Sequence, residues 1–212
     1  MQARRILVLG ATGGTGRDVV LQALQQGHAV TALARRPERM GHTHERLRFI
    51  AADLASDGAT LDDAIRGQEA VISALGQGSS LRSMGLIARS MPKIIDAMTR
   101  LGVARLIVTS AYGVGATWED VPAVPRILIR LLLGDLYADK EAGEATLRRS
   151  ALDWTLVYPT MLTNGPRTDR YRVGERLSLR GLPRISRADL AAFLLTQIED
   201  RSYIRKGVLI SA

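Results

Sequence analysis

The sequence predicts an α/β fold in which helices flank both faces of a doubly wound parallel sheet. Two observations lead to this prediction. Short apolar segments alternate along the chain with longer segments of helical periodicity. The apolar segments, such as ILVL at 6–9 and LIVT at 106–109, are nearly continuous, which is typical of strands buried on both faces. We expect one domain over 1–212, with 161–184 forming a small C-terminal lobe that covers the substrate.

The predicted elements follow one another in a regular order. The strands cover 4–9, 29–34, 47–52, 70–75, 105–109, 154–158 and 208–210. The helices cover 15–26, 61–66, 85–101, 126–149 and 186–199. Gly27 and Gly67 follow the first two helices, as glycine commonly does at a helix C-terminus. A polar loop at 76–83 precedes the third helix, and Ser186 with Asp189 forms an acidic capping box at the last one.

The composition is that of a globular protein and excludes several kinds of site. Apolar residues make up 46% and charged residues 24% of the 212. The absence of cysteine excludes disulfides, thiolate zinc sites and a cysteine nucleophile. His28, His42 and His44 lack matching ligands, so we expect no metal site. No apolar run is long enough for a membrane span or a signal peptide, so we expect a cytoplasmic protein that contacts no membrane.

The charge balance favours an anionic small molecule as the ligand. Lysine and arginine number 29 against 21 acidic residues, which gives a net charge of +8. Aromatic residues are only 4%, and the arginines are dispersed along the chain, so we expect no nucleic acid partner. Six of the arginines lie in the expected lobe at 161–184, where we expect either a solvated basic surface or a site for an anionic acceptor.

The segment LVLGATGGTGR at 7–17 is the strongest functional signal. Its glycines follow the first strand directly and open the first helix. A pyrophosphate must approach the backbone closely at such a turn, and the helix start presents free N–H groups and a positive dipole end. Position in a strand–turn–helix unit makes the motif specific. The expected cofactor contacts in this turn are Gly10, Thr12, Gly13, Gly14, Thr15 and Gly16.

The G-x-x-G-x-x-G spacing resembles that of extended and atypical short-chain dehydrogenase/reductases. Further landmarks agree with this resemblance: ALARRP at 32–37, AADL at 51–54, SALG at 73–76, VTSAYG at 108–113 and VYPT at 157–160. The sequence is most similar to the biliverdin reductase B and flavin reductase group of the NmrA-like branch. The resemblance covers nearly the whole chain and implies a Rossmann-type domain that binds a nicotinamide cofactor.

The residues after the second strand predict NADP(H) rather than NAD(H). An NAD-selective site has an acidic residue there, whereas this chain has Arg35 and Arg36, followed by Arg39. A guanidinium binds a 2′-phosphate through paired, charge-assisted hydrogen bonds, and a carboxylate would repel it. The family resemblance implies that Asp53 and Leu54 meet the adenine. It also implies that Leu75 and Gly76 pass beside the adenosine ribose and the pyrophosphate.

The chain departs from the usual Tyr-x-x-x-Lys catalytic pair. Tyr137 and Lys140 are separated by two residues instead of three, although both spacings share a helix face. The resemblance places Ser110 at the end of the fifth strand, and Tyr112 two residues later is a candidate substrate wall. Ser110, Tyr112, Tyr137 and Lys140 are therefore the candidate catalytic residues. Thr109, Ser110 and Lys140 are also expected near the cofactor, and Pro159 and Thr160 are expected to flank its carboxamide.

Three functions remain open from the sequence. The first is an NADPH-dependent reductase that transfers hydride to a flavin, a quinone or a similar planar conjugated acceptor. Such acceptors draw their proton from solvent and do not require the tyrosine–lysine pair. The second is a non-catalytic NADP(H)-sensing protein. The third is a carbonyl reductase, epimerase or isomerase that uses Tyr137 as its acid. The related flavin reductases favour a monomer.

Overall fold

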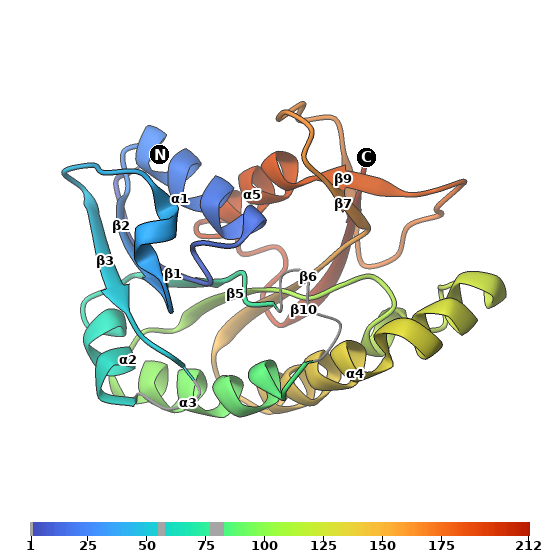
Figure 1. Cartoon of the computed structure of the whole chain (residues 1–212), viewed down its shortest axis with the longest axis horizontal. Coiled ribbons are helices and arrows are strands. Elements are labelled where there is room, and N and C mark those ends of the chain that lie inside the picture. The colour runs from blue at the N-terminus through green and yellow to red at the C-terminus, as the bar shows by residue number, and fades with distance from the viewer. Residues whose placement is uncertain (1, 55–57, 77–82) are drawn as a thin grey trace.

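The computed structural model describes residues 2–54, 58–76 and 83–212, and its centre is an eight-stranded sheet (Figure 1). The strand order is β3-β2-β1-β4-β5-β6-β10-β8, and every neighbouring pair except β10–β8 is parallel. The parallel strands are β1 Arg5–Leu9, β2 Ala29–Ala34, β3 Leu47–Ala51, β4 Ala70–Ser73, β5 Arg105–Thr109, β6 Asp153–Pro159 and β10 Lys206–Ser211. The predicted doubly wound α/β fold is confirmed. The expected loop at 76–83 falls largely outside the described residues.

Helices cover both faces of this sheet. On one face lie α1 (Gly14–Gln25) and α5 (Arg187–Thr196), and on the other lie α2 (Gly58–Ile65), α3 (Leu86–Arg100) and α4 (Ala123–Arg148), as Figure 1 shows. Two 3₁₀ turns lie at Pro37–Met40 (η1) and Gly115–Thr117 (η2). The sequence pattern did not predict these turns. The five helices match the predicted ones, with ends shifted by one to three residues.

The strand side chains divide into two cores because successive residues of a strand point to opposite faces. In β1, Ile6 and Val8 pack beneath α1 and α5, whereas Leu7 and Leu9 pack against α3. All four are fully buried. The continuous apolar runs that predicted a covered parallel sheet therefore supply both cores at once.

The C-terminal segment forms more regular structure than the sequence pattern indicated. Residues Arg172–Gly174 form β8, which pairs antiparallel with β10 and extends the main sheet. Residues Met161–Thr163 (β7) and Arg184–Ser186 (β9) form a separate two-stranded parallel sheet. Three-residue strands carry too little periodicity to be recognised in the sequence. Part of the expected covering lobe is thus an edge of the sheet.

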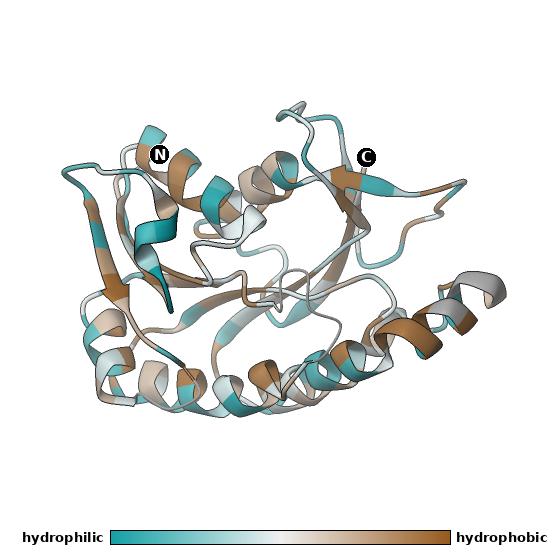
Figure 2. Ribbon diagram, viewed as in Figure 1, coloured by the Kyte–Doolittle hydropathy of each residue, from teal (hydrophilic) through white to brown (hydrophobic). Residues whose placement is uncertain are grey.

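Helix α4 extends beyond the body of the sheet at its N-terminal half (Figure 1), and Figure 2 shows apolar residues along that half. Ile127, Leu131 and Leu132 are more than half exposed there. Within the described part of the chain, no helix combines the length and apolar character needed to cross a membrane.

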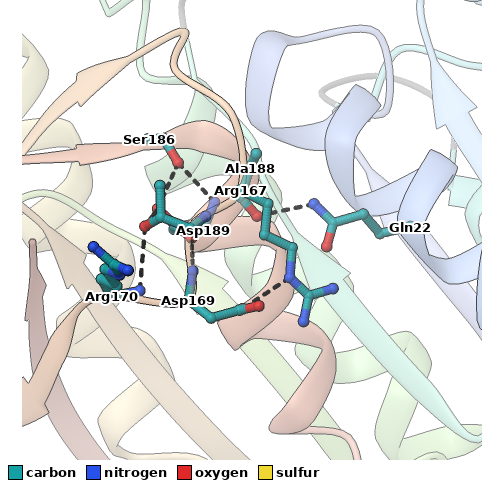
Figure 3. Close-up of polar contacts among 8 residues, drawn as sticks. Gln22, Arg167, Asp169, Arg170, Ser186, Ala188 and Asp189 are labelled. Carbon is teal, nitrogen blue, oxygen red and sulfur yellow. Dashed lines mark hydrogen bonds and ion pairs between the residues drawn. The ribbon is translucent and has the colours of Figure 1, made fainter.

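Asp189 anchors the C-terminal segment to the start of α5 (Figure 3). Its carboxylate is buried and accepts hydrogen bonds from the N–H groups of Thr168 and Asp169, at 2.7 and 2.8 Å. The hydroxyls of Thr168 and Ser186 donate to it at 2.9 Å, and Ser186 Oγ accepts from the Asp189 N–H. Burial alone would raise the pKa of Asp189, but these four donors lower it overall.

We predict that Asp189→Asn lowers the free energy of unfolding by about 2 kcal/mol, which corresponds to a fall in Tm of about 4–8 °C. The amide cannot accept all four hydrogen bonds. Because the pKa is lowered in the folded state, the stabilisation is present above the usual pKa of 3.8 and is lost as the pH falls below it. Thermal unfolding at pH 7 and pH 3 should show the Tm difference between the two proteins shrinking at the lower pH.

Candidate functional site

At the turn between β1 and α1, the backbone at Gly10, the backbone at Gly16 and the chain just after β4 lie so close together that no side chain fits between them. A Cβ on Gly16 would lie 2.2 Å from the Gly10 carbonyl oxygen. Gly10 has a φ of +77°, and a Cβ there would lie 2.8 Å from the carbonyl oxygen of Ala74, beyond the end of β4. Glycine is therefore required at both positions. The chain can in this way start a helix directly above the carboxyl end of β1.

The start of α1 is open to an anion. Gly13 is the N-cap, so no side chain caps the first turn, and this turn carries no acidic residue. The first N–H groups of a helix have no partner within the helix, and they lie at the positive end of its dipole. The turn thus has the features of a phosphate-binding loop, and its backbone fits a dinucleotide pyrophosphate.

A cavity of about 360 Å³ continues from this turn over the carboxyl ends of β1, β2 and β4. It brings together more than half of the residues that the sequence assigned to the cofactor. These are Gly10, Thr12, Gly13, Arg35, Arg36, Asp53, Leu54, Leu75 and Gly76. Arg39, Leu33 and Leu86 also line it. Gly14 lies exposed beside it, and Thr15 and Gly16 are buried in the packing of α1.

The rim of this cavity beyond β2 is strongly basic. Arg35, Arg36 and Arg39 all line it. The guanidinium of Arg17 on α1 donates a hydrogen bond to the Arg39 carbonyl and so ties the η1 turn to the helix. Glu38 is the one acidic residue of this turn. Three guanidinium groups thus gather at the end of the cavity beyond β2, where they can hold an anionic group of a ligand.

Ser110 lies at the carboxyl end of β5, as expected, and belongs to a buried hydrogen-bonded chain. Its hydroxyl donates to Glu144 Oε1 at 2.5 Å, and the Tyr158 hydroxyl donates to Glu144 Oε2 at 2.6 Å. Tyr158 in turn accepts a hydrogen bond from Arg148 at 2.9 Å. These contacts join β5, β6 and α4. A Cβ on Gly115 would lie 2.9 Å from Glu144, so the loop after β5 closes over this carboxyl group.

Burial raises the pKa of Glu144, although Ser110, Tyr158, Arg148 and Lys140 all act in the opposite direction. Burial also lowers the pKa of Lys140, one helical turn away, against the attraction of Glu144 and Asp139. Both groups therefore favour their neutral forms more than they would in water. Perturbed pKa values of this kind are common at functional sites, although buried structural networks show them too.

The Tyr137 hydroxyl is engaged by the backbone of the loop after β5, and its catalytic pairing with Lys140 stays a prediction. The Tyr137 hydroxyl donates to the carbonyl of Tyr112 at 3.0 Å, and burial raises its pKa. The Tyr112 hydroxyl donates to the Asp120 carbonyl, and burial raises its pKa as well. Both phenols thus hold the loop that follows β5. Tyr137 also lines a second cavity of about 600 Å³ between this loop and α4.

The other expected contacts lie at the carboxyl ends of β5 and β6. Thr109 Oγ1 is buried and has no hydrogen-bond partner among the described residues. The Thr160 N–H donates to the Ile210 carbonyl, and the carbonyl of Pro159 accepts from the Tyr112 N–H. These bonds join β6 to its neighbours, and the expected place of both residues beside the carboxamide stays a prediction.

Sequence reasoning missed the acidic residues of α4. Glu144 was not singled out, and neither was Asp139, whose carboxylate accepts from the N–H groups of Ile87 and Ala88 and caps α3. One signal was present in the sequence: Glu144 lies four residues after Lys140 and so shares its helix face. Among the described residues, no group of three histidine or acidic side chains is placed to hold a metal ion.

A comparison with protein families identifies this arrangement. The model of a family described as NAD(P)H-binding matches residues 10–201, from the first glycine of the turn to beyond α5. The chain belongs to this NAD(P)H-binding family. The match confirms the predicted resemblance at the family level and supports a nicotinamide cofactor.

Relatives of this family member include proteins named oxidoreductases and proteins without a named activity. An uncharacterised chloroplastic protein of Arabidopsis thaliana is 27% identical over 79% of this chain, which spans 62% of that protein's length. Oxidoreductase stcQ of Emericella nidulans is 27% identical over 96% of this chain and 81% of its own. The expected NAD(P)H-dependent oxidoreductase class is confirmed by the family and by such relatives.

Solved structures of the same fold include ChuY of Escherichia coli O157:H7, described as an anaerobillin reductase. It superposes with a TM-score of 0.81 at 20% identity, covering 97% of this chain and 96% of its own. At this identity the likeness supports the fold alone. The cytoplasmic location stays a prediction.

We predict that Glu144→Gln makes the protein relatively more stable as the pH rises. A pKa raised in the folded state means that the stabilisation from Glu144 is present below its usual value of 4.5 and is lost as the pH rises through the raised pKa. The isosteric amide has no such loss. Thermal unfolding at pH 5 and pH 8 should show the Tm of the variant, relative to the parent, increasing with pH. A difference independent of pH would contradict the buried, ionising carboxyl group.

Proposed function

We propose that the protein is an NADPH-dependent reductase of a planar conjugated acceptor, such as a flavin, a quinone or a tetrapyrrole. The observation that carries the proposal is the basic rim of the cofactor cavity, combined with the engagement of the Tyr137 hydroxyl by the carbonyl of Tyr112. The rim supports NADPH as the donor. The engaged hydroxyl of Tyr137 disfavours carbonyl reduction, which requires a proton donor at the substrate oxygen.

The cofactor preference follows from the arginines around the ribose end. Arg35, Arg36 and Arg39 converge on the cavity from the segment after β2, where an NAD-selective site would place a carboxylate. A guanidinium forms paired hydrogen bonds with a phosphate, and each is stronger than a bond between neutral groups. The 2′-phosphate of NADPH is the group that these residues would hold.

We expect Arg35→Ala to weaken NADPH binding about tenfold and to change NADH binding less than about twofold, because only NADPH carries the 2′-phosphate. Titration of the purified variant with each nucleotide measures both constants. Arg180→Ala, which removes an exposed arginine of the C-terminal segment, is the matched control for the loss of one positive charge. Equal losses for NADPH and NADH would contradict the assignment.

The acceptor side is supported by the second cavity, between the loop after β5 and α4. Trp118 contributes an indole to its lining, Arg130 a guanidinium and Tyr137 a phenol ring. Flat aromatic walls with a cation suit a planar anionic acceptor. ChuY, of similar fold, is described as a reductase of such a molecule. When bound, a nicotinamide cofactor supplies the hydride, and the side chains of this chain position the acceptor and exclude water.

The decisive experiment is NADPH oxidation by the purified protein with added FMN, followed as the loss of nicotinamide absorbance. We expect acceptor-dependent turnover well above the protein-free rate. Tyr137→Phe should retain most of that turnover, since the phenol donates to a backbone carbonyl rather than to a substrate. A near-complete loss in Tyr137→Phe would instead favour a carbonyl reductase or epimerase. NADPH binding without turnover on flavins, quinones and tetrapyrroles would favour an NADP(H) sensor.

A further inference from the structure

Gly14 is a glycine that the pyrophosphate motif does not require. The G-x-x-G-x-x-G spacing uses Gly10, Gly13 and Gly16, and Gly14 occupies one of its variable positions. A Cβ at Gly14 would lie 2.7 Å from both Cδ and Nε of Arg187, and 3.5 Å from its Cζ. A side chain from the start of α5 therefore lies directly on the phosphate-binding turn, although 173 residues separate it from Gly14 in the sequence.

Arg187 has no counter-ion in this position. The side chain is half-buried, and its Nη1 donates to the neutral Oδ1 of Asn164 at 2.6 Å. Among the residues that the structure describes, no carboxylate lies within ion-pair distance of it. Asp18 on α1 is close enough for its pKa to be affected: burial raises this pKa, and the charges of Arg187 and Arg17 oppose the rise. The guanidinium thus retains free donors beside an uncapped helix start.

The position of Arg187 is fixed from both sides. It follows Ser186, the N-cap of α5, whose hydroxyl is bonded to Asp189. Gln22 on α1 donates to the Ala188 carbonyl at 2.9 Å and joins the two helices (Figure 3). The same Asp189 that anchors the C-terminal segment therefore sets the start of α5 against α1. A guanidinium held in this way loses little entropy when it binds an anion.

We propose that Arg187 is a pyrophosphate-binding residue of the cofactor site, which completes the glycine turn with a cation from the C-terminal segment. The backbone of the turn provides N–H donors but no net charge, and Arg187 supplies a positive charge where that turn is most open. With glycine at position 14, this side chain can lie across the turn. The inference rests on the cofactor part of the proposed function and is independent of the acceptor.

Arg187 is expected to contact a different part of the cofactor from Arg35, Arg36 and Arg39, which line the basic rim of the cavity. Arg35 faces the 2′-phosphate, which NADH lacks, whereas the pyrophosphate is common to NADPH and NADH. Arg187→Ala should therefore weaken both nucleotides by the same factor, about tenfold or more. Binding of adenosine 2′-monophosphate, which has no pyrophosphate, should be unchanged. Arg187→Lys should recover part of the loss, since it restores the charge without the planar donor geometry.

The test is a direct binding titration of NADPH, NADH and adenosine 2′-monophosphate, with no acceptor present. A failed reductase assay would therefore not affect its outcome. If circular dichroism shows that the alanine variant does not fold, Arg187→Gln replaces it in the titrations. This variant removes the charge but keeps a polar side chain near Asn164. Arg180→Ala is again the matched control and should leave all three constants unchanged. The proposal is overturned if both neutral variants bind NADPH and NADH within about twofold of the parent, or if only NADPH binding falls.

Discussion

The close approach of the β1–α1 turn to its neighbours is the constraint on which the rest of the site depends. The backbone at Gly10 and Gly16 leaves no space for a Cβ, because the Gly10 carbonyl and the end of β4 occupy it. This contact sets α1 directly above the carboxyl end of β1 and leaves its first N–H groups without a cap. The cavity toward β2 and the open helix start are both consequences of one steric requirement.

A second constraint acts at the opposite end of the site. Glu144 is buried between β5, β6 and the loop that closes over it, and it is satisfied by the hydroxyls of Ser110 and Tyr158. A buried carboxyl group is tolerated only when its hydrogen bonds are made, so these strands and α4 are held in one arrangement. The hydroxyl of Ser110 at the carboxyl end of β5 is oriented by its hydrogen bond to this group.

The C-terminal segment links the two ends of the site. Asp189 accepts hydrogen bonds from the backbone of residues 168 and 169 and is hydrogen-bonded to Ser186, the N-cap of α5. Helix α5 in turn packs on α1. The segment therefore contributes to the site through a helix start placed beside the glycine turn, as well as through an edge strand. Between residues 161 and 187, the arginines other than Arg167 form no ion pair among the described residues.

The sequence by itself determined the local parts of this protein. Continuous apolar runs predicted the parallel strands. The glycine turn and the arginines after β2 could be recognised in the sequence because each consists of a few adjacent residues. Only the tertiary structure decided which distant side chains meet: Glu144 with Ser110, Arg187 with Gly14, and the Tyr137 hydroxyl with the carbonyl of Tyr112. Such pairings arise from how helices pack across a sheet. Contacts between residues so far apart leave no periodic signal in the chain.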